Sequence, residues 1–493
     1  MVADATDPTR DAPTEASRAA ARGVAWLGTE RWATNVVSGV AFLALGRLLN
    51  PDQFGVVAAA TTVVLFLRLF VDAGFQRALV QRERISDELI DTAFWTSMAT
   101  SVGLALGLFA CAPLVAEMFG EPQLTNVTRV LSVVFLFTAL DSTQSALIDR
   151  TMQFRVQAIR RFSATATGAA VGVVLALAGA GVWALVAQTI TVEVVLVVLL
   201  WSLASWRPRL RFSRAAFREL SHWGRNYLGI RTLVYLYENA DNFLVGVVLG
   251  PVALGIYVIG YRVLVVFNEA IALTADQVTL PLFSRFQAER DRLHPIFYRT
   301  LNLGAAAALP AYAVLALTAH DSLPFVFGDR WIGSVPVMQS LALAGAIQAI
   351  GGYLRNLMLA TGQVANEFRW NLLLTVATVA GFGATVHWGV TAVALSLGVV
   401  ALLLLPLRIT QVRRLCQLDL RSIYGSLAGP LVATAAMAVP VVAVTIAAGG
   451  LPRPVRLLLA LATAAAAYPL ALRVVAPVTW RSLLAAARTI RHR

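Results

Sequence analysis

The sequence predicts an all-α integral membrane protein with fourteen transmembrane helices. Of its 493 residues, 58% are hydrophobic and only 14% are charged, whereas roughly 25% of an ordinary soluble domain is charged. Apolar runs recur along the whole chain, separated by short polar loops. A membrane-spanning helix needs about 20 apolar residues, so fourteen helices would use roughly 290 residues. Too little polar sequence then remains for a soluble enzyme on a small membrane anchor, and a disordered or fibrous chain is also excluded.

The arginines predict that both ends of the chain lie in the cytoplasm. All 40 basic residues are arginines, the formal net charge is +13, and the arginines cluster between apolar runs. With the N-terminus inside, 30 arginines fall in segments predicted to be cytoplasmic and 4 in segments predicted to be outside. Such an excess is typical of the cytoplasmic loops of membrane proteins. Because the arginines form no single patch, no nucleic-acid partner is expected.

The order of polar and apolar segments predicts six parts of the chain. They are a disordered cytoplasmic tail (1–23), a six-helix lobe (24–204), a linker helix on the cytoplasmic surface (205–223), a second six-helix lobe (224–407), a cytoplasmic loop with two further helices (408–477) and an amphipathic cytoplasmic tail (478–493). The first part lacks the apolar core of a signal peptide. The linker and the last part mix arginine with Phe, Trp and Leu at helical spacing, which favours helices lying beside anionic head groups.

An internal repeat indicates that the two lobes are pseudo-equivalent. The pattern Gly-x-x-Leu-x-Pro-x-x-x-Gly occurs twice, 200 residues apart, as Gly46, Leu49, Pro51 and Gly55 and as Gly246, Leu249, Pro251 and Gly255. Each copy lies at the predicted outer turn between the first and second helix of its lobe. Proline and glycine there end one helix and open the next. Transporters are commonly built from repeated halves around a central site.

Charged side chains within the spans are the candidate functional residues. An ionisable group in hydrocarbon costs about 3 to over 10 kcal/mol, so it tends to face a polar cavity or a partner. In the span predicted near 224–249, Arg231, Tyr235, Glu238 and Asn242 share one helical face, and Asp241 lies beside them.

Three further spans carry charges at helical spacing. The next span holds Arg262, Glu269 and Asp276, each seven residues apart and therefore on one face. Arg68 is followed four residues later by Asp72, which predicts an ion pair within one helix. Arg31 precedes Arg231 by 200 residues, at the matching place in the repeat.

Two segments resemble a known family. Residues 48–81 and 238–267 are similar to the polysaccharide flippases, including the Wzx-type O-antigen and colanic-acid-type exporters of the multidrug/oligosaccharidyl-lipid/polysaccharide superfamily. The residues that carry the resemblance in the second segment are Asp241, Gly246, Gly250, Leu254, Gly255, Tyr257 and Tyr261. The resemblance covers about residues 22–480.

The resemblance implies a transport function without enzymatic activity or a cofactor. Such proteins move an undecaprenyl-diphosphate-linked oligosaccharide to the outer leaflet of the bacterial inner membrane, for synthesis of cell-surface polysaccharide. Two lobes rock around a central cavity in alternating access, driven by a proton or sodium gradient or by the membrane potential. The bilayer and the lipid-linked oligosaccharide are the implied partners, with a polysaccharide polymerase and glycosyltransferases as further candidates.

This function assigns roles to the charged residues. A diphosphate head group is anionic and needs arginines or helix N-termini. The predicted substrate-binding cations are Arg31, Arg68, Arg231 and Arg262. The predicted carriers of a coupling ion are Glu238, Asp241, Glu269 and Asp276. The structural alternatives are that Arg31 and Arg231 extend to the interface, that Arg68 and Arg262 form ion pairs with Asp72 and Glu238, and that Asp276 faces the cytoplasm. Arg129, Glu193 and Arg473 are expected to be helix-end or interhelical anchors.

Two other functions stay open. One is a peptidoglycan-precursor or multidrug exporter of the same superfamily, although a site for cationic drugs would favour an acidic, aromatic cavity. The other is a membrane enzyme of glycan assembly, which would need a large polar loop or clustered Asp, Glu and His at the head-group region. The chain shows neither feature. Its two cysteines and five scattered histidines also lack metal-ligand spacing, so no metal site is expected.

Overall fold

The computed structural model confirms the all-α class. It describes the backbone of residues 15–491 except 73–74, 83–84, 152 and 205, and every regular element in this part of the chain is helical. Side chains are described except those of residues 15–29, 31, 72, 154, 223, 226, 230, 270–277 and 486–491. Within the described part, eleven helices are long and apolar enough to cross a membrane.

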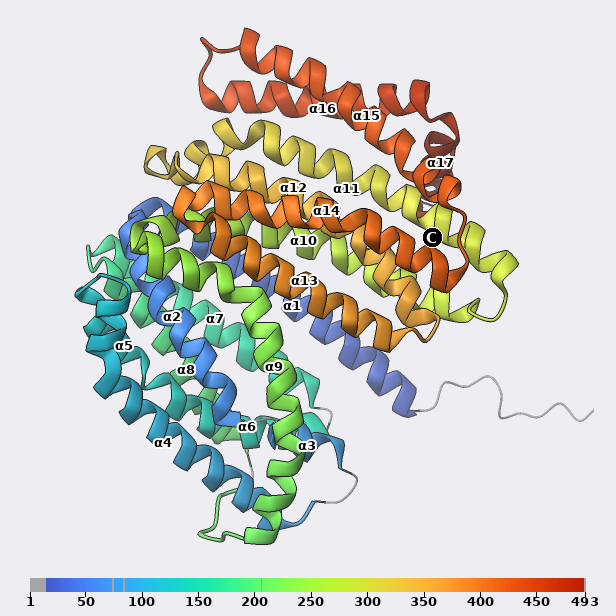
Figure 1. Cartoon of the computed structure of the whole chain (residues 1–493). Coiled ribbons are helices and arrows are strands. Elements are labelled where there is room, and N and C mark those ends of the chain that lie inside the picture. The colour runs from blue at the N-terminus through green and yellow to red at the C-terminus, as the bar shows by residue number, and fades with distance from the viewer. Residues whose placement is uncertain (1–14, 73–74, 83–84, 152, 205, 492–493) are drawn as a thin grey trace, which may run out of the picture. The chain divides into compact units, whose positions relative to one another are not determined.

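The helices follow one another with short connections (Figure 1). The first eight are α1 (Glu15–Leu48), α2 (Pro51–Asp72), α3 (Phe75–Gln81), α4 (Asp87–Met118), α5 (Gln123–Leu131), α6 (Val134–Arg150), α7 (Phe154–Leu177) and α8 (Val182–Leu203). The remainder are α9 (Arg214–Leu249), α10 (Pro251–Arg285), α11 (Arg290–Phe327), α12 (Ser334–Ala360), α13 (Val364–Thr385), α14 (Val390–Cys416), α15 (Leu420–Ala447), α16 (Arg453–Val475) and α17 (Pro477–Arg491), with 3-10 turns η1 (Asp329–Trp331) and η2 (Val386–Trp388).

The chain divides into two compact units, and two of the three borders lie inside helices α2 and α9. Unit 1 comprises the chain up to Leu49 and Ala60–Tyr235, and unit 2 comprises Asn50–Ala59 and everything after Tyr235. The first ten residues around the start of α2 therefore belong to unit 2, and the rest of α2 to unit 1. Helix α9 passes the other way, from unit 1 into unit 2. Its unbroken course joins the expected surface linker and the span that follows it into one helix.

In unit 1, α7 packs against both α1 and α8, and α6 packs against α4 and α8. Small residues permit the closest of these approaches: a Cβ on Gly168 of α7 would collide with Val192 of α8. A separate apolar cluster around Leu79, Ile90 and Leu220 buries one side of the first turns of α9. This burial explains why the arginine-rich start of α9 is folded against unit 1 as a helix.

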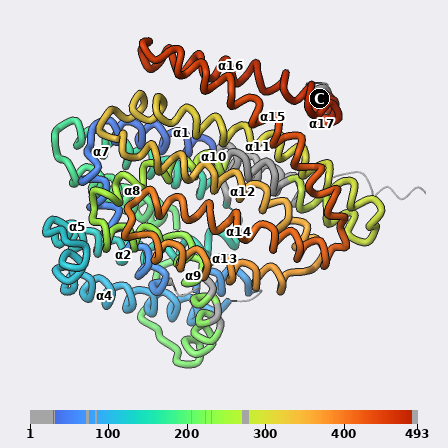
Figure 2. Tube along the Cα trace, turned by 45° about the horizontal axis from the view of Figure 1, so that its top comes forward, coloured from blue at the N-terminus to red at the C-terminus, as the bar shows by residue number. Residues whose placement is uncertain are grey.

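In unit 2, α12 lies at the centre and packs against α10, α11 and α14. Helices α15 and α16 form a hairpin beside α11 (Figures 1 and 2). The hydroxyl of Tyr468 on α16 donates to the backbone oxygen of Ala306 on α11 at 2.6 Å. Arg456 of α16 also forms an ion pair with Asp321 of α11. The two added helices are thus an integral part of this unit.

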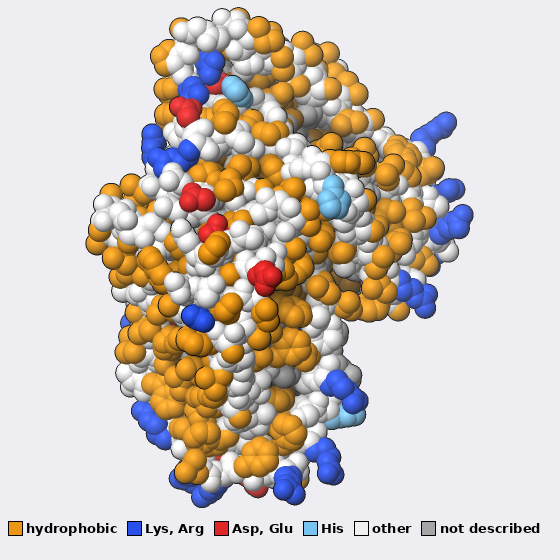
Figure 3. All heavy atoms as spheres, turned by 60° about the vertical axis from the view of Figure 1, so that its left-hand side comes forward, with side chains coloured by type: hydrophobic (Ala, Val, Ile, Leu, Met, Phe, Trp, Pro, Cys, Tyr) orange, Lys and Arg blue, Asp and Glu red, His pale blue; other side chains and the backbone are white. Residues whose placement is uncertain are grey.

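The surface has the composition of a protein surrounded by lipid. Large apolar side chains are exposed on most of the long helices, including Leu106, Val174, Leu403 and Ile446. On the face shown in Figure 3, hydrophobic side chains cover most of the area, and the basic side chains gather mainly near its margins. Water would not favour such a surface, whereas a bilayer does.

Candidate functional site

A carboxylate without a basic partner is buried in unit 2. Asp241 of α9 is 3% exposed. The hydroxyl of Tyr257 on α10 donates to its Oδ2 atom at 2.6 Å, and the backbone N–H of Asn242 donates to its Oδ1 atom at 2.8 Å. Both donors are neutral, and no arginine or histidine of the described chain bonds to this carboxylate. An isolated buried charge is costly unless a proton or a cation neutralises it, so Asp241 is suited to hold one.

Aromatic and charged side chains surround Asp241. The rings of Tyr257 and Tyr261 stack with their centroids 5.8 Å apart. Tyr237 of α9 lies within electrostatic range of Asp241, of Glu238 and of Arg355 on α12. We call these six residues, from three helices of unit 2, the Asp241 cluster. It combines carboxylates, hydroxyls and one guanidinium within otherwise apolar helices.

Sequence reasoning did not single out Arg355 as a candidate residue. It lies in the last turns of α12, which ends at Ala360, and within electrostatic range of Tyr237. An arginine close to the end of an apolar run is also typical of the flank of a membrane span, so the sequence contained no further signal.

The other predicted residues of unit 2 lie on open faces. Glu238, Arg262 and Glu269 are exposed, and only Glu238 belongs to the Asp241 cluster. The side chain of Asp276 lies outside the described residues. The common face expected for Arg262, Glu269 and Asp276 on α10 therefore stays a prediction.

In unit 1, Arg68 of α2 binds Glu193 of α8. The Nη1–Oε1 distance is 2.7 Å and the Nη2–Oε2 distance is 3.4 Å, so the two groups meet side by side. The predicted partner was Asp72, whose side chain lies outside the described residues. Glu193 thus contacts a second helix, α2, as expected for an interhelical anchor. Arg68 keeps 32% of its side chain exposed, which leaves one side of the guanidinium open.

The two remaining arginines of the prediction also belong to unit 1. Arg231 has an exposed side chain on α9. The side chain of Arg31 lies outside the described residues. Between Arg231 and the end of unit 1, Tyr235 donates its hydroxyl to the backbone oxygen of Thr62 on α2 and lies against Phe66. The predicted face of α9 thus contacts α2 through Tyr235.

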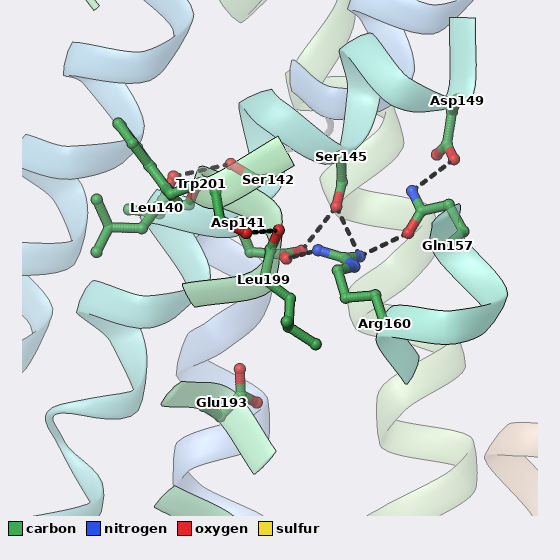
Figure 4. A network of polar contacts seen from close by, with 12 residues as sticks. Leu140, Asp141, Ser142, Ser145, Asp149, Gln157, Arg160, Glu193, Leu199 and Trp201 are labelled. Atoms are coloured by element: carbon green, nitrogen blue, oxygen red, sulfur yellow. Dashed lines mark hydrogen bonds and ion pairs between the residues drawn. The ribbon is translucent and has the colours of Figure 1, made fainter. Parts of the chain in front are cut away.

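A buried arginine of unit 1 is paired with a carboxylate (Figure 4). Arg160 of α7 forms an ion pair with Asp141 of α6 and donates to Ser145 at 3.0 Å and to Gln157 at 2.7 Å. Gln157 in turn donates to Asp149 at 2.9 Å. Arg160 lies on the second turn of α7, which begins at Phe154. This network joins α6 to α7.

Unit 2 contains a comparable buried pair. Arg408 of α14 and Glu367 of α13 are 3% and 7% exposed and form an ion pair. The guanidinium also lies 5.0 Å from the ring centre of Trp370. Each charge has its opposite, as for Arg160 and Asp141. These pairs hold helices together, and they differ in this respect from the Asp241 cluster, whose carboxylate is uncompensated.

Comparison with known proteins identifies the family. A family model described as "Polysaccharide biosynthesis protein" matches residues 44–336, which is more than half of the chain. The chain belongs to this polysaccharide biosynthesis protein family. The chain is 27% identical to the succinoglycan biosynthesis transport protein ExoT of Rhizobium meliloti (strain 1021), over 74% of each chain. It is 24% identical to the lipopolysaccharide biosynthesis protein WzxC of Escherichia coli (strain K12), over 70% of this chain and 71% of that protein.

Solved structures show the same fold. The lipid II flippase MurJ in an inward closed conformation aligns with a TM-score of 0.74 and 10% identity, over 93% of this chain and 99% of that one. An inward-facing multidrug resistance transporter of the MATE family, in the MOP superfamily, aligns with a TM-score of 0.59 and 15% identity, over 78% and 95%. The predicted resemblance to Wzx-type proteins of this superfamily is confirmed. With eleven helices of its described part long and apolar enough to cross a membrane, this member of the family is a multi-pass membrane protein.

The arrangement limits the available chemistry. In the part of the chain that the structure describes, no three His, Cys, Asp or Glu side chains meet as metal ligands. Of the two cysteines, Cys416 is buried and Cys111 is exposed on another helix. As chemistry, a buried carboxylate such as that of Asp241 is able to bind a proton or a small cation, and guanidinium groups bind oxyanions.

Proposed function

We propose that this protein is a flippase that carries an undecaprenyl-diphosphate-linked oligosaccharide to the outer leaflet of the bacterial inner membrane, for synthesis of cell-surface polysaccharide. The proposal rests on one observation: this member of the polysaccharide biosynthesis family has ionisable side chains within its apolar helices. Such groups are expensive in a bilayer and mark pathways for polar substrates and ions. The relatives named for transport and biosynthesis of succinoglycan and lipopolysaccharide support this assignment.

We propose fourteen spans with both termini in the cytoplasm. Eleven helices qualify by length and hydropathy, and α1, α7 and α9 are also long, with 34, 24 and 36 residues. These three helices carry several of the charges discussed above, which lowers their hydropathy. The excess of arginine in alternate connections supports the orientation.

The arginines serve the lipid head group in this proposal. A diphosphate presents oxygen acceptors that guanidinium groups bind through paired hydrogen bonds. Arg31, Arg68, Arg231 and Arg262 are the proposed contacts, and we add Arg355, the guanidinium of the Asp241 cluster. Arg68 would exchange part of its contact with Glu193 for phosphate oxygens.

Asp241 is the proposed carrier of the coupling ion, with Glu238 beside it. Its carboxylate is buried among neutral donors, so gain or loss of a positive charge there changes the local energy strongly. Glu269 and Asp276 are the further candidates on α10. A proton or sodium gradient would act through these groups, whereas the membrane potential would also act on the charge of the substrate itself.

A genetic test decides between the proposal and its alternatives. Deletion of the gene in its host should abolish a surface polysaccharide and cause its lipid-linked repeat unit to accumulate, and the wild-type gene should restore export. Normal polysaccharide in the deletion strain would overturn the proposal. Rescue of a strain that lacks its peptidoglycan-precursor flippase would instead support the lipid II function named for the MurJ structure. Resistance to cationic drugs, without a change in polysaccharide, would support a multidrug exporter.

A further inference from the structure

The segment between α8 and α9 is bound to unit 1 through its backbone. We call residues 206–213, which are not helical, the linker strap. The Oδ1 atom of Asp91 on α4 accepts the backbone N–H of Arg209 at 3.0 Å, and the indole N–H of Trp95 on α4 donates to the carbonyl oxygen of Arg209 at 2.8 Å. Both hydrogen bonds use backbone atoms of Arg209, and its side chain stays 63% exposed. The middle of the strap is therefore fixed to α4.

Two further hydrogen bonds fix the ends of the linker strap. The backbone N–H of Ser213 donates to the hydroxyl of Thr92 on α4 at 3.1 Å, and the amide of Gln144 on α6 donates to the carbonyl oxygen of Trp206 at 3.0 Å. Asp91, Thr92 and Gln144 are at most 1% exposed, so water competes little for these bonds. The strap is thus a fixed part of unit 1 and not a loose tether.

The linker strap and the start of α9 expose large apolar side chains. Leu210 is 89% exposed and Phe212 is 57% exposed. Phe217, in the first turn of α9, is 40% exposed, and its ring centroid lies 6.0 Å from that of Phe212. Exposed apolar side chains that gather in one place mark a contact with a partner or with a membrane. The fixed backbone therefore presents a surface that is suited to an apolar environment.

Arginines border these apolar side chains. The exposed ones are Arg207, Arg209, Arg211, Arg214 and Arg218. Arg209 forms an ion pair with Asp87 at 3.9 Å. In the part of the chain that the structure describes, no ion pair joins Arg211, Arg214 or Arg218 to a carboxylate. We call these five arginines and the three apolar residues above the strap patch, which combines positive charge with apolar side chains.

The place of the strap patch along the chain favours a lipid partner. Helix α8 is long and apolar enough to cross a membrane, and it ends at Leu203, just before the strap. Helix α4, which holds the strap near its start at Asp87, also qualifies as a span. A patch bound where two such helices end lies at the membrane surface, where acyl chains and phosphate groups are both within reach. The combination of arginine with Leu and Phe is typical of segments that bind anionic lipids.

We infer that the strap patch binds the cytoplasmic leaflet, with Leu210, Phe212 and Phe217 among the acyl chains and its arginines at the head groups of anionic phospholipids. The inference rests on the proposed orientation, which places the connection between α8 and α9 in the cytoplasm, and it goes beyond transport of the substrate. The cytoplasmic leaflet carries negative charge, which attracts arginines. Because the strap is hydrogen-bonded to α4 and α6, this contact anchors the folded body of unit 1 and not a flexible linker.

A fluorescent probe on the strap tests the lipid contact without any transport assay. Phe212→Cys is labelled with an environment-sensitive fluorophore in a Cys111→Ser background, which removes the exposed native thiol, whereas Cys416 is buried. Its emission should lie at shorter wavelength in nanodiscs of phosphatidylcholine with phosphatidylglycerol than in phosphatidylcholine alone, and a quencher on the acyl chains should reduce it. The control is Trp388→Cys, at a position that is 77% exposed within residues 370–407, which contain no arginine. Emission of the control should be the same in both lipids.

Arginine variants test the charge of the strap patch. Arg211→Gln/Arg214→Gln, combined with the labelled Phe212→Cys, should reduce the effect of phosphatidylglycerol severalfold, because each arginine near the surface contributes to the attraction. The matched control is Arg413→Gln/Arg414→Gln, which removes two exposed arginines near the end of α14. The control should leave the effect of phosphatidylglycerol unchanged.

The outcomes separate the lipid contact from the proposed function. Equal emission of the Phe212→Cys probe in the two lipids would overturn the inference. Emission typical of water in both lipids would also overturn it and would indicate that the strap patch faces solvent or a protein. Equal loss of the phosphatidylglycerol effect in the two double variants would overturn it too, because the charge of the patch would then have no special part. Labelling of Phe212→Cys from outside spheroplasts by an impermeant maleimide would overturn the proposed orientation, whereas failure of the polysaccharide test would leave all these results unchanged.

Discussion

The hydroxyl of Tyr257 lies 2.6 Å from the carboxylate of Asp241 and joins α10 to α9 inside unit 2. The two helices follow each other in the chain and turn at Gly250, so this bond crosses directly between them. The carboxylate accepts it most strongly when charged. Binding of a proton or a cation at Asp241 would therefore weaken the Tyr257–Asp241 hydrogen bond between α9 and α10. Ion binding would in this way affect how the two helices pack.

Replacement of Tyr257 by phenylalanine should lower both the stability of the protein and its gradient-driven transport. The variant loses a donor to a buried carboxylate, and a hydrogen bond to a charged group is worth about 1.5–3 kcal/mol. The melting temperature and the initial rate of export from vesicles under an imposed gradient measure the two effects. Tyr261→Phe is the control, because that ring stacks on Tyr257. Wild-type stability and transport of Tyr257→Phe would show that this hydrogen bond has no part in the account.

Asp241→Asn should abolish the response of transport to an imposed proton or sodium gradient. The amide keeps the shape of the carboxyl group but cannot exchange a proton. The variant should fold at least as well as the wild type, because a buried charge without a basic partner is removed. Gradient-driven export and the melting temperature of the purified protein measure the two effects. Glu289→Gln, at an exposed site, should change neither, and a gradient response retained by Asp241→Asn would exclude this residue as the carrier.

Arg68→Gln alone should lower both stability and transport. Removal of the guanidinium leaves the carboxylate of Glu193 buried and unpaired, and the expected cost is about 2 kcal/mol, less than the 3–5 kcal/mol of a fully buried pair because Arg68 is one-third exposed. The double variant Arg68→Gln/Glu193→Gln should regain the stability but not the transport. Membrane abundance and surface polysaccharide are measured together. Wild-type transport by the double variant would assign Arg68 a structural role only.

Arg408→Ala should destabilise the protein by about 3–5 kcal/mol, because it leaves Glu367 charged and buried. Replacement of both residues in Arg408→Met/Glu367→Leu should recover most of the lost stability. It should also permit normal transport, because the pair holds α13 and α14 together and is not part of the Asp241 cluster. Thermal unfolding in detergent compares the stability of the wild type, Arg408→Ala and Arg408→Met/Glu367→Leu. Arg413→Ala, on the exposed side of the same helix, is the control. Equal stability of Arg408→Ala and the control would contradict a structural role for the pair.

Asp419 should stabilise the start of α15 in a pH-dependent manner. The Ser422 hydroxyl and then its backbone N–H donate to this N-cap carboxylate, at 2.7 and 2.8 Å, and lower its pKa below the ordinary 3.8. The folded pKa is depressed, so the contribution is present above pH 3.8 and is lost as the pH falls through the folded pKa. The difference in Tm between wild type and Asp419→Ala should shrink as the pH is lowered from 6 to 3. A constant difference would contradict this account of the cap.

The fold class could be predicted from the sequence, and Asp241 could be recognised as a candidate, because both depend on local patterns. Helices in a membrane are recognised by the length of their apolar runs, and Asp241 and Glu238 stand out because they interrupt one such run. The repeat around Pro51 and Pro251 was equally visible as a pattern. Each of these features lies within a few turns of one helix.

The contacts between distant segments could not be predicted. Arg68 and Glu193 are 125 residues apart, and the nearer Asp72 offered a simpler partner at helical spacing. The sequence predicted a helix within residues 205–223, but not that its residues around Leu220 would pack against the segments of Leu79 and Ile90. The sequence also shows two matching turns without showing that Gly55 and Pro251 touch.

The most direct measurement is movement of a fluorescent lipid-linked oligosaccharide in liposomes that contain the purified protein. A membrane-impermeant quencher reports the fraction in the outer leaflet. The account predicts that an imposed ion gradient drives the labelled lipid across the bilayer with the wild-type protein and not with Asp241→Asn. Movement at the same rate in protein-free liposomes, or equal gradient-driven movement by both proteins, would contradict it.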